Sequence, residues 1–212
     1  MGIERATISG HVVDANGAAL AGATILVRAS GERTVSDNDG AFVLDVPAST
    51  TLTVATTAAH MAPTLLPQFI LSPDGNASFT IPMVASDRLA GLVAMGPNPM
   101  GGAVAVNVKS VAGAHGTAGD TTIELTPSNL GRVLYAPESH GMPDPDPALT
   151  AIGPGDDCLA WALGVQPHVS IMELSLRGTA QLQPPYSIDD VIYPGTFTVD
   201  AGSLTLVTLF TP

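Results

Sequence analysis

One segment of the sequence gathers the side chains best suited to metal binding or catalysis. Glu138, His140, Asp144 and Asp146 fall within nine residues, with prolines on both sides of Asp144. An imidazole and carboxylates together can ligate a divalent metal or carry out general acid–base chemistry. Prolines favour an extended backbone that would hold these side chains apart. The same residues also suit a rigid, solvated surface loop, so a metal site and a plain loop are alternatives here.

Two tyrosines are the candidates for holding a ligand by stacking. Tyr186 follows a Pro-Pro pair, and Tyr193 precedes Pro-Gly. A tyrosine ring combines an apolar face with a polar tip, so an exposed pair could hold a sugar. Packing in the core or at its rim is the alternative for each ring. The single tryptophan, Trp161, lies in an apolar run and is expected in the core.

No spacing of residues is typical of a known class of catalytic site. The chain has no Gly-x-Ser-x-Gly turn, no His-Glu-x-x-His pair and no glycine fingerprint for phosphate or dinucleotide binding. We therefore predict no catalytic residues and no cofactor, and we expect a non-enzymatic protein rather than an enzyme. The segment from Asp37 to Gly40 resembles half a calcium loop but lacks the downstream glutamate, so a hairpin turn between two strands is the preferred interpretation.

Composition excludes several classes of partner. Seven basic residues stand against nineteen acidic ones, giving a net charge of −12. Nucleic acid is therefore not an expected partner, because phosphate binding needs clustered Lys and Arg. The apolar runs are too short for a transmembrane segment, and Cys158 is alone, so no internal disulfide can form. The first residues lack an apolar signal-peptide core, so an export signal would lie outside the printed sequence.

Short runs of apolar and β-branched residues, separated by Gly and Pro turns, predict an all-β fold. Only 12% of the residues are charged, against about 25% in typical domains. An Asn-Gly pair at 16–17 predicts a tight turn. The last two strands of the first part are expected to pair with each other across residues 72–75. In the first part the predicted strands cover residues 8–14, 23–28, 34–36, 41–46, 51–55, 68–71 and 77–81.

The order of these strands and turns resembles the carboxypeptidase regulatory-like family, whose domains are transthyretin-like sandwiches. The resemblance covers residues 6–84 and implies one such sandwich there. The chain departs from the family pattern at Ala59-His60, where the family often has Gly-Tyr. The residues that fall on the pattern are Gly10, Asp14, Gly17, Gly22, Ala23, Asp39, Gly40, Phe42 and Leu44.

Residues 85–99 and 100–212 complete the predicted organisation. A short linker helix is expected in 85–99, capped by Ser86 and followed by a Gly-Pro stop. Residues 100–212 are expected to form a second, degenerate transthyretin-like sandwich with longer loops. Its predicted strands cover residues 103–108, 121–125, 132–135, 148–152, 158–163, 168–176, 196–199 and 204–210.

These observations favour a secreted or cell-surface bacterial protein with a structural or interaction role. Low charge and β-sheet edges would permit self-association, so the expected partner is a protein or a second copy. A carbohydrate-binding module that uses Tyr186 and Tyr193 is the first alternative, with a glycan as partner. A metal-dependent enzyme that uses the segment around His140 is the second.

Overall fold

The fold is described from a computed structural model, which covers residues 4–110, 121–137, 141–152, 159–167, 173–177 and 181–211. Strands dominate these residues, and α1 is the one α-helix among them, so the predicted all-β class is confirmed. None of the described helices has the length and apolar character needed to cross a bilayer.

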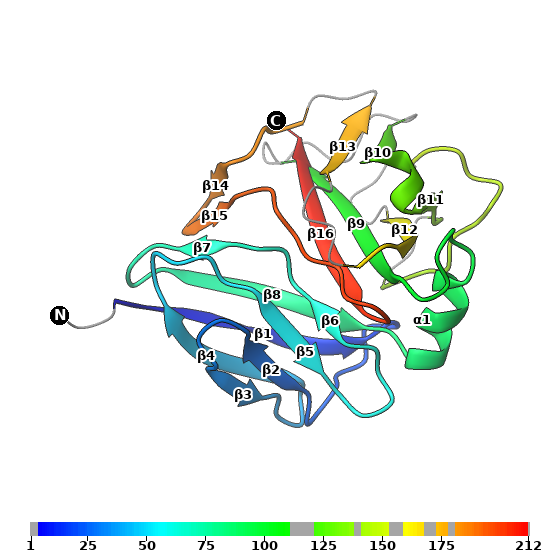
Figure 1. Cartoon of the computed structure of the whole chain (residues 1–212). Coiled ribbons are helices and arrows are strands. Elements are labelled where there is room, and N and C mark those ends of the chain that lie inside the picture. Colours follow the sequence, from blue (N-terminus) through cyan, green and yellow to red (C-terminus); the bar gives the residue numbers. More distant parts are fainter. Residues whose placement is uncertain are drawn as a thin grey trace.

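The first half is a two-layered sandwich (Figure 1). One layer has the strand order β4-β1-β8, and the other layer contains β3, β2, β5 and β6. Apolar side chains such as Ile8, Ile25 and Phe69 fill the space between them. The strands of this half are β1 (Arg5–Asp14), β2 (Thr24–Val27), β3 (Arg33–Val35), β4 (Ala41–Pro47), β5 (Val54–Thr57), β6 (Thr64–Leu65), β7 (Ile70–Leu71) and β8 (Asn76–Met83).

The predicted pairing across residues 72–75 is wrong. β8 runs parallel to β1 over the whole register from Thr7↔Asn76 to Asp14↔Met83, whereas β7 pairs with β15 (Val191–Tyr193) of the second half. The two-residue β7 offers β8 few backbone partners, while β1 offers a full ladder. Similarly, the turn at 37–40 does not join neighbours in one sheet, because β3 and β4 belong to different layers.

Gly10 allows β1 and β8 to lie together. A Cβ atom at this position would be 1.8 Å from the carbonyl oxygen of Phe79, and the φ of Gly10 is +150°. Both the space and the backbone conformation therefore require glycine.

The second half continues one sheet of the first. Eight strands lie in the order β11-β12-β9-β16-β6-β5-β2-β3, so strands from both halves share one backbone ladder (Figure 1). A separate pair, β10 and β13, packs over this sheet. The remaining elements are α1 (Ser86–Val93), β9 (Gly102–Ser110), β10 (Thr122–Thr126), η1 (Ser128–Leu130), β11 (Arg132–Tyr135), β12 (Leu159–Val165), β13 (Glu173–Arg177), β14 (Tyr186–Ile188), β15 (Val191–Tyr193) and β16 (Leu204–Thr211).

Both faces of the second-half sheet are covered. Val104 and Ala162 face a core that includes Ile123 and Leu174 of β10 and β13. Trp161 and Leu163 face the opposite way, into a cluster with Leu92 of α1. As a result every residue of β12 is buried.

The linker helix forms where the sequence places it, with one change at its start. Ala85 is the N-cap and makes no side-chain capping bond, so the prediction that Ser86 caps the helix is wrong. Asp87 lies in the first turn, where its charge suits the helix dipole. Leu89, Leu92 and Val93 are buried against the second-half sheet and against Val84.

Two predicted strands in the second half are wrong, and one hairpin was missed. Residues 148–152 contribute only an isolated bridge at Ile152, and residues 196–199 form no strand. The hairpin of β14 and β15 was not predicted, because its two strands have only three residues each. The division of the chain at residues 85–99 stays a prediction.

Candidate functional site

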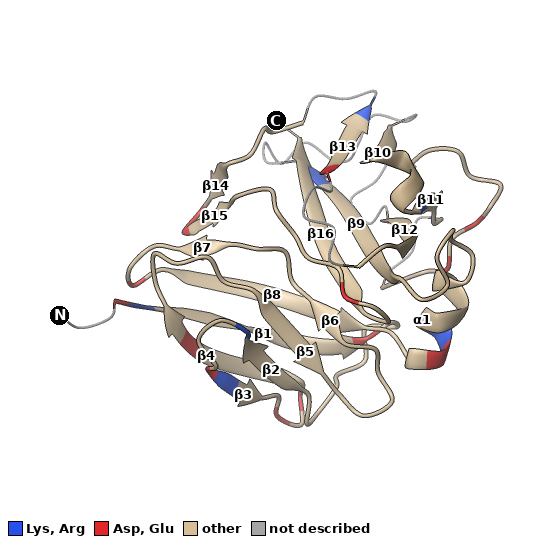
Figure 2. Ribbon diagram, viewed as in Figure 1, with Lys and Arg blue, Asp and Glu red and all other residues tan. Residues whose placement is uncertain are grey.

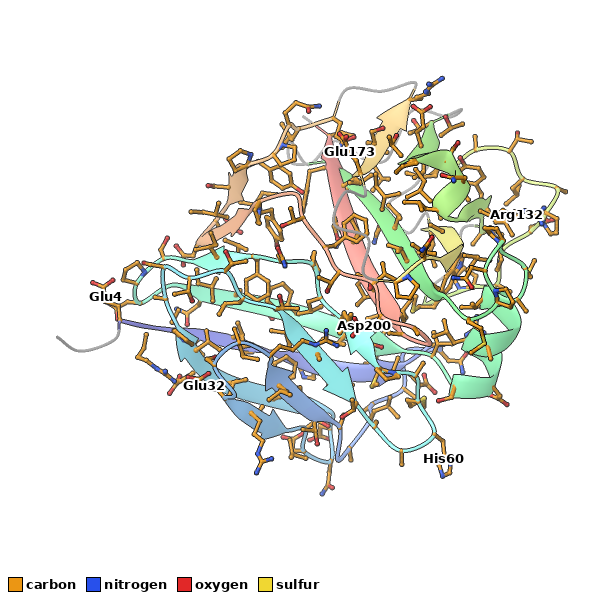
Figure 3. The ribbon with its side chains drawn as sticks, viewed as in Figure 1. Glu4, Glu32, His60, Arg132, Glu173 and Asp200 are labelled. Atoms are coloured by element: carbon orange, nitrogen blue, oxygen red, sulfur yellow. The ribbon has the colours of Figure 1, made fainter. Side chains whose placement is uncertain are left out.

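A small pocket lies where the two halves meet beside β16. Its volume is about 60 Å³. Its walls come from Gln68 after β6, from Glu173 at the start of β13, from residues 181–186 and from residues 193–197. Its floor is formed by Val207, Thr208 and Leu209 of β16. Figure 3 labels Glu173 beside the upper part of β16.

The free edge of β16 creates the space for this pocket. β16 pairs with β9 along its whole length, but on the other side it meets β6 only at Leu204 and Thr205. Beyond these two residues the edge is approached by the segment around Leu182, whose N–H donates to the Phe210 carbonyl at 2.8 Å. The Tyr186 hydroxyl donates to the Thr208 carbonyl at 3.4 Å.

The structure brings the two predicted ligand-binding tyrosines together. Tyr186 and Tyr193 are opposite each other in the β14–β15 ladder, and their rings stack with centroids 5.5 Å apart. Phe210 of β16 packs against both rings, with its centroid 5.5 Å from Tyr186 and 5.8 Å from Tyr193. Both tyrosines are half-buried and both line the pocket. Each ring therefore packs at the rim of a core and also presents an edge to the pocket.

Burial keeps the phenols of these tyrosines protonated. Desolvation, followed by the charge interaction with Tyr193, raises the pKa of Tyr186 to about 12. Desolvation, followed by the negative charge of Asp189, raises the pKa of Tyr193 as well. At neutral pH both hydroxyls are neutral groups that can donate and accept hydrogen bonds.

Amides and hydroxyls supply most of the polar lining. The Gln181 Oε1 accepts the N–H of Leu176 at 2.8 Å. This bond fixes the orientation of the amide and leaves its NH₂ group free of Leu176. The Gln68 Oε1 accepts the Thr196 hydroxyl at 2.5 Å. Gln183, Ser175 and Thr208 also line the pocket.

The pocket lining itself carries one negative charge, and Lys109 of β9 lies outside the lining as the register partner of Phe210. Glu173 is the one charged residue among the described lining residues, and Asp189 acts on the neighbouring Tyr193. Lys and Arg are absent from β14, β15 and the connection from β15 to β16 in Figure 2. An anionic ligand would therefore meet repulsion here.

The segment predicted to bind a metal is held by structural contacts where the structure describes it. Asp144 accepts hydrogen bonds from Arg88 Nε at 2.9 Å and Nη2 at 2.7 Å. Asp146 Oδ1 accepts the N–H of Ala148 at 2.9 Å. Glu138 and His140 lie outside the described residues. Within the described residues no three His, Cys, Asp or Glu side chains come together as metal ligands would.

Sequence reasoning found the tyrosines of the pocket but missed its polar wall. Gln68 is 128 residues away from Thr196 in the chain. The one local signal was the run from Gln181 to Tyr186, which combines two glutamines, two prolines and an aromatic ring. The rest depends on strand pairing that the sequence pattern does not reveal.

The two-layered sandwich of the first half agrees with a known domain family. Residues 7–84 match the carboxypeptidase regulatory-like domain family. This part of the chain is therefore a carboxypeptidase regulatory-like domain, as the resemblance implied. No curated protein matches the chain in sequence.

Several solved structures are similar to the chain. A mutant type II cohesin–X-dockerin complex from Acetivibrio cellulolyticus is similar over 38% of this chain and 58% of its own, with 22% identity and a TM-score of 0.32. The TIE protein of Bacillus anthracis is similar over 98% of this chain and 34% of its own, with 10% identity and a TM-score of 0.34. A streptococcal ancillary pilin is similar over 99% of this chain and 63% of its own, with 13% identity and a TM-score of 0.28. The chain thus spans less than two thirds of each of these structures, and at these TM-scores no inference about function follows.

Proposed function

We propose that the protein is a non-enzymatic structural and interaction module of the cell exterior, in which two halves act as one stiff body. The observation that carries this proposal is the position of β16. This last strand lies between β9 of the second half and β6 of the first, so one ladder of backbone hydrogen bonds runs through both. The cell-exterior location extends the expectation from the sequence, and the family match of residues 7–84 itself names no location.

Further contacts tie the halves together at several points. Arg28 after β2 forms an ion pair with Asp200 before β16, and Figure 3 labels Asp200 between the two halves. The Gln68 N–H donates to the Thr196 carbonyl at 3.1 Å, and the Leu204 N–H donates to the Pro63 carbonyl at 2.9 Å. Two halves held by backbone bonds at separate places resist bending better than two domains on a linker would.

The first experiment compares unfolding of the two halves. Trp161 is the single tryptophan and is fully buried in the second half, so its fluorescence reports on that half. Far-UV circular dichroism reports on the strands of both. In a denaturant titration the two signals should give one coincident transition. Loss of the Trp161 signal at clearly lower denaturant would contradict the stiff-body proposal.

We also propose that the protein self-associates through the outer edge of the first half. Val35 on edge strand β3 is 57% exposed, and Val43 on edge strand β4 is 64% exposed. Apolar edge strands can pair with another copy, and a lysine on such a strand prevents this. Light scattering should show a mass that rises with concentration for the unaltered protein and not for Val43→Lys. Thr150→Lys, in an exposed second-half loop, is the matched control. A monomer at every concentration would rule out self-association and leave a different molecule as the partner.

A further inference from the structure

We infer that the pocket beside β16 binds the edge of a neutral, hydroxyl-rich ligand of the saccharide class. This inference rests on the proposed role as an interaction module, and it names the ligand that one surface of the module would take. Three features of the pocket support it: its hydrogen-bonding groups, its charge and its size.

The polar groups of the pocket match hydroxyls. A hydroxyl both donates and accepts, and so do the amides of Gln68 and Gln183 and the hydroxyl of Thr208. The Gln68 and Gln181 oxygens are already bonded to Thr196 and Leu176, which leaves their NH₂ groups in fixed orientations as donors. Preoriented donors reduce the cost of ordering side chains when a ligand binds.

The apolar groups of the pocket match the C–H faces of a sugar ring. Pro67 and Pro184 line it together with Tyr186 and Tyr193. The stacking of the two tyrosines on each other and on Phe210 holds their rings in place before any ligand arrives. Binding sites of this kind combine apolar walls with a few placed polar groups.

The charge of the lining residues disfavours an anionic ligand. Glu173 and the nearby Asp189 disfavour carboxylates and phosphates, and no Lys or Arg is among the described residues that line the pocket. The lining has several amides and hydroxyls but one carboxylate. Hydrogen bonds to the amides and hydroxyls, and not an ion pair, would therefore determine which ligand fits the pocket.

The size of the pocket limits how much of the ligand it holds. A volume of about 60 Å³ accepts the edge of one ring or a hydroxymethyl group, and the rest of the saccharide stays in solvent. A contact this small should give a dissociation constant on the order of 1 mM.

Saturation-transfer NMR on the full chain tests the inference. Cellobiose, maltose and lactose serve as neutral probes, while glucose, glucuronate and glucosamine share one ring and differ in charge. We expect transfer to at least one neutral disaccharide, weaker transfer to glucuronate than to glucose, and transfer to glucosamine at least equal to that to glucose, because the charge of Glu173 attracts an ammonium group. Absence of transfer to every neutral sugar at about ten times the expected dissociation constant would overturn the inference. So would stronger transfer to glucuronate than to glucose, because the charge of Glu173 disfavours a carboxylate.

Two variants of pocket residues test whether the ligand binds in this pocket. Thr208→Val keeps the branched shape and removes one hydroxyl, and Gln183→Ala removes an exposed amide, so both should fold and each should weaken binding by about tenfold. Gln166→Ala, also exposed but outside the pocket, should bind as the unaltered protein does. Equal binding by all three variants would overturn the assignment to this pocket.

Failure of this inference can be told apart from failure of the proposed function. Coincident unfolding without saccharide binding would reject the ligand class and leave the stiff module intact. Saccharide binding with two separate unfolding transitions would reject the stiff module and keep the pocket.

Discussion

β4 in the first half and β12 in the second half each have seven residues, but they are buried in different ways. Along β4 buried and accessible side chains alternate, because one face of its sheet lies on the core and the other faces solvent. Along β12 all seven residues are buried, because β10 and β13 cover one face and α1 with residues near Met142 covers the other. A sheet covered on one face has a visible period of two, and a sheet covered on both faces does not.

This difference in burial explains why a family pattern describes the first half and not the second. In the first half, local alternation and turn residues match the carboxypeptidase regulatory-like domain. In the second half the layers are completed by segments far apart in the chain, such as β16 on β9 and β15 on β7. Substitutions in the first half should therefore test contacts between neighbouring strands, and substitutions in the second half should test the burial of a sheet on both faces.

Gly10→Ala should produce the largest loss of stability. The new Cβ would be 1.8 Å from the Phe79 carbonyl oxygen, so β1 and β8 would have to separate. We expect a loss of about 3 kcal/mol or more in the free energy of unfolding, measured by denaturant titration. Gly17→Ala is the control, because Gly17 also has a positive φ but no atom within 4 Å of the added Cβ. That variant should lose only about 1 kcal/mol. Equal losses of unfolding free energy in the two variants would show that the backbone conformation of Gly10, and not its contact with β8, determines the cost.

Trp161→Phe should give an intermediate loss and test the two-sided burial of β12. The fully buried indole packs near Leu92 of α1, and its Nε1–H donates to the Pro143 carbonyl at 3.0 Å. Phenylalanine would leave that carbonyl without its donor and leave space in the core, at a cost of about 2 kcal/mol. Phe69→Leu in the first-half core, measured by circular dichroism in parallel, should cost about 1 kcal/mol because no hydrogen bond is lost. A smaller loss for Trp161→Phe than for Phe69→Leu would contradict this comparison.

Tyr186 should give the smallest effect, visible only at high pH. Its pKa is raised from 10.0 to about 12 in the folded protein, so folding favours the neutral phenol. The stabilisation is complete below about pH 10 and is lost as the pH rises toward 12. An absorbance titration should show a late phenol step near pH 12 that is missing in Tyr186→Phe. A step near pH 10 for Tyr186 would mean that its ring is solvated and that the wall of the pocket is open.

Particular elements show how far sequence reasoning reached. β1, β4 and α1 were predicted because the residues within each element are enough to indicate a strand or a helix. The pairing of β8 with β1 was not predicted, since pattern identifies a strand but not its partner. The pocket was half predicted: its tyrosines were singled out by their surroundings, while Thr208 and Gln68 joined them only through strand pairing.

The sequence by itself determined the local turns. Asp14 Oδ1 accepts the N–H groups of Asn16 at 2.8 Å and Ala18 at 2.9 Å, and Asp37 Oδ1 accepts those of Asp39 and Ala41, both at 2.9 Å. These bonds span at most four residues, so residue type alone specifies them. The turn interpretation of residues 37–40 follows from this use of Asp37.

The tertiary structure alone decided that the two halves share a sheet. β16 forms its ladders with β9 and β6, which are about a hundred residues or more away in the chain. Backbone groups carry no information about which partner they should bond, so partner choice depends on how the apolar faces of both halves can be buried at once. That global requirement places Tyr186, Tyr193 and Thr208 around one pocket.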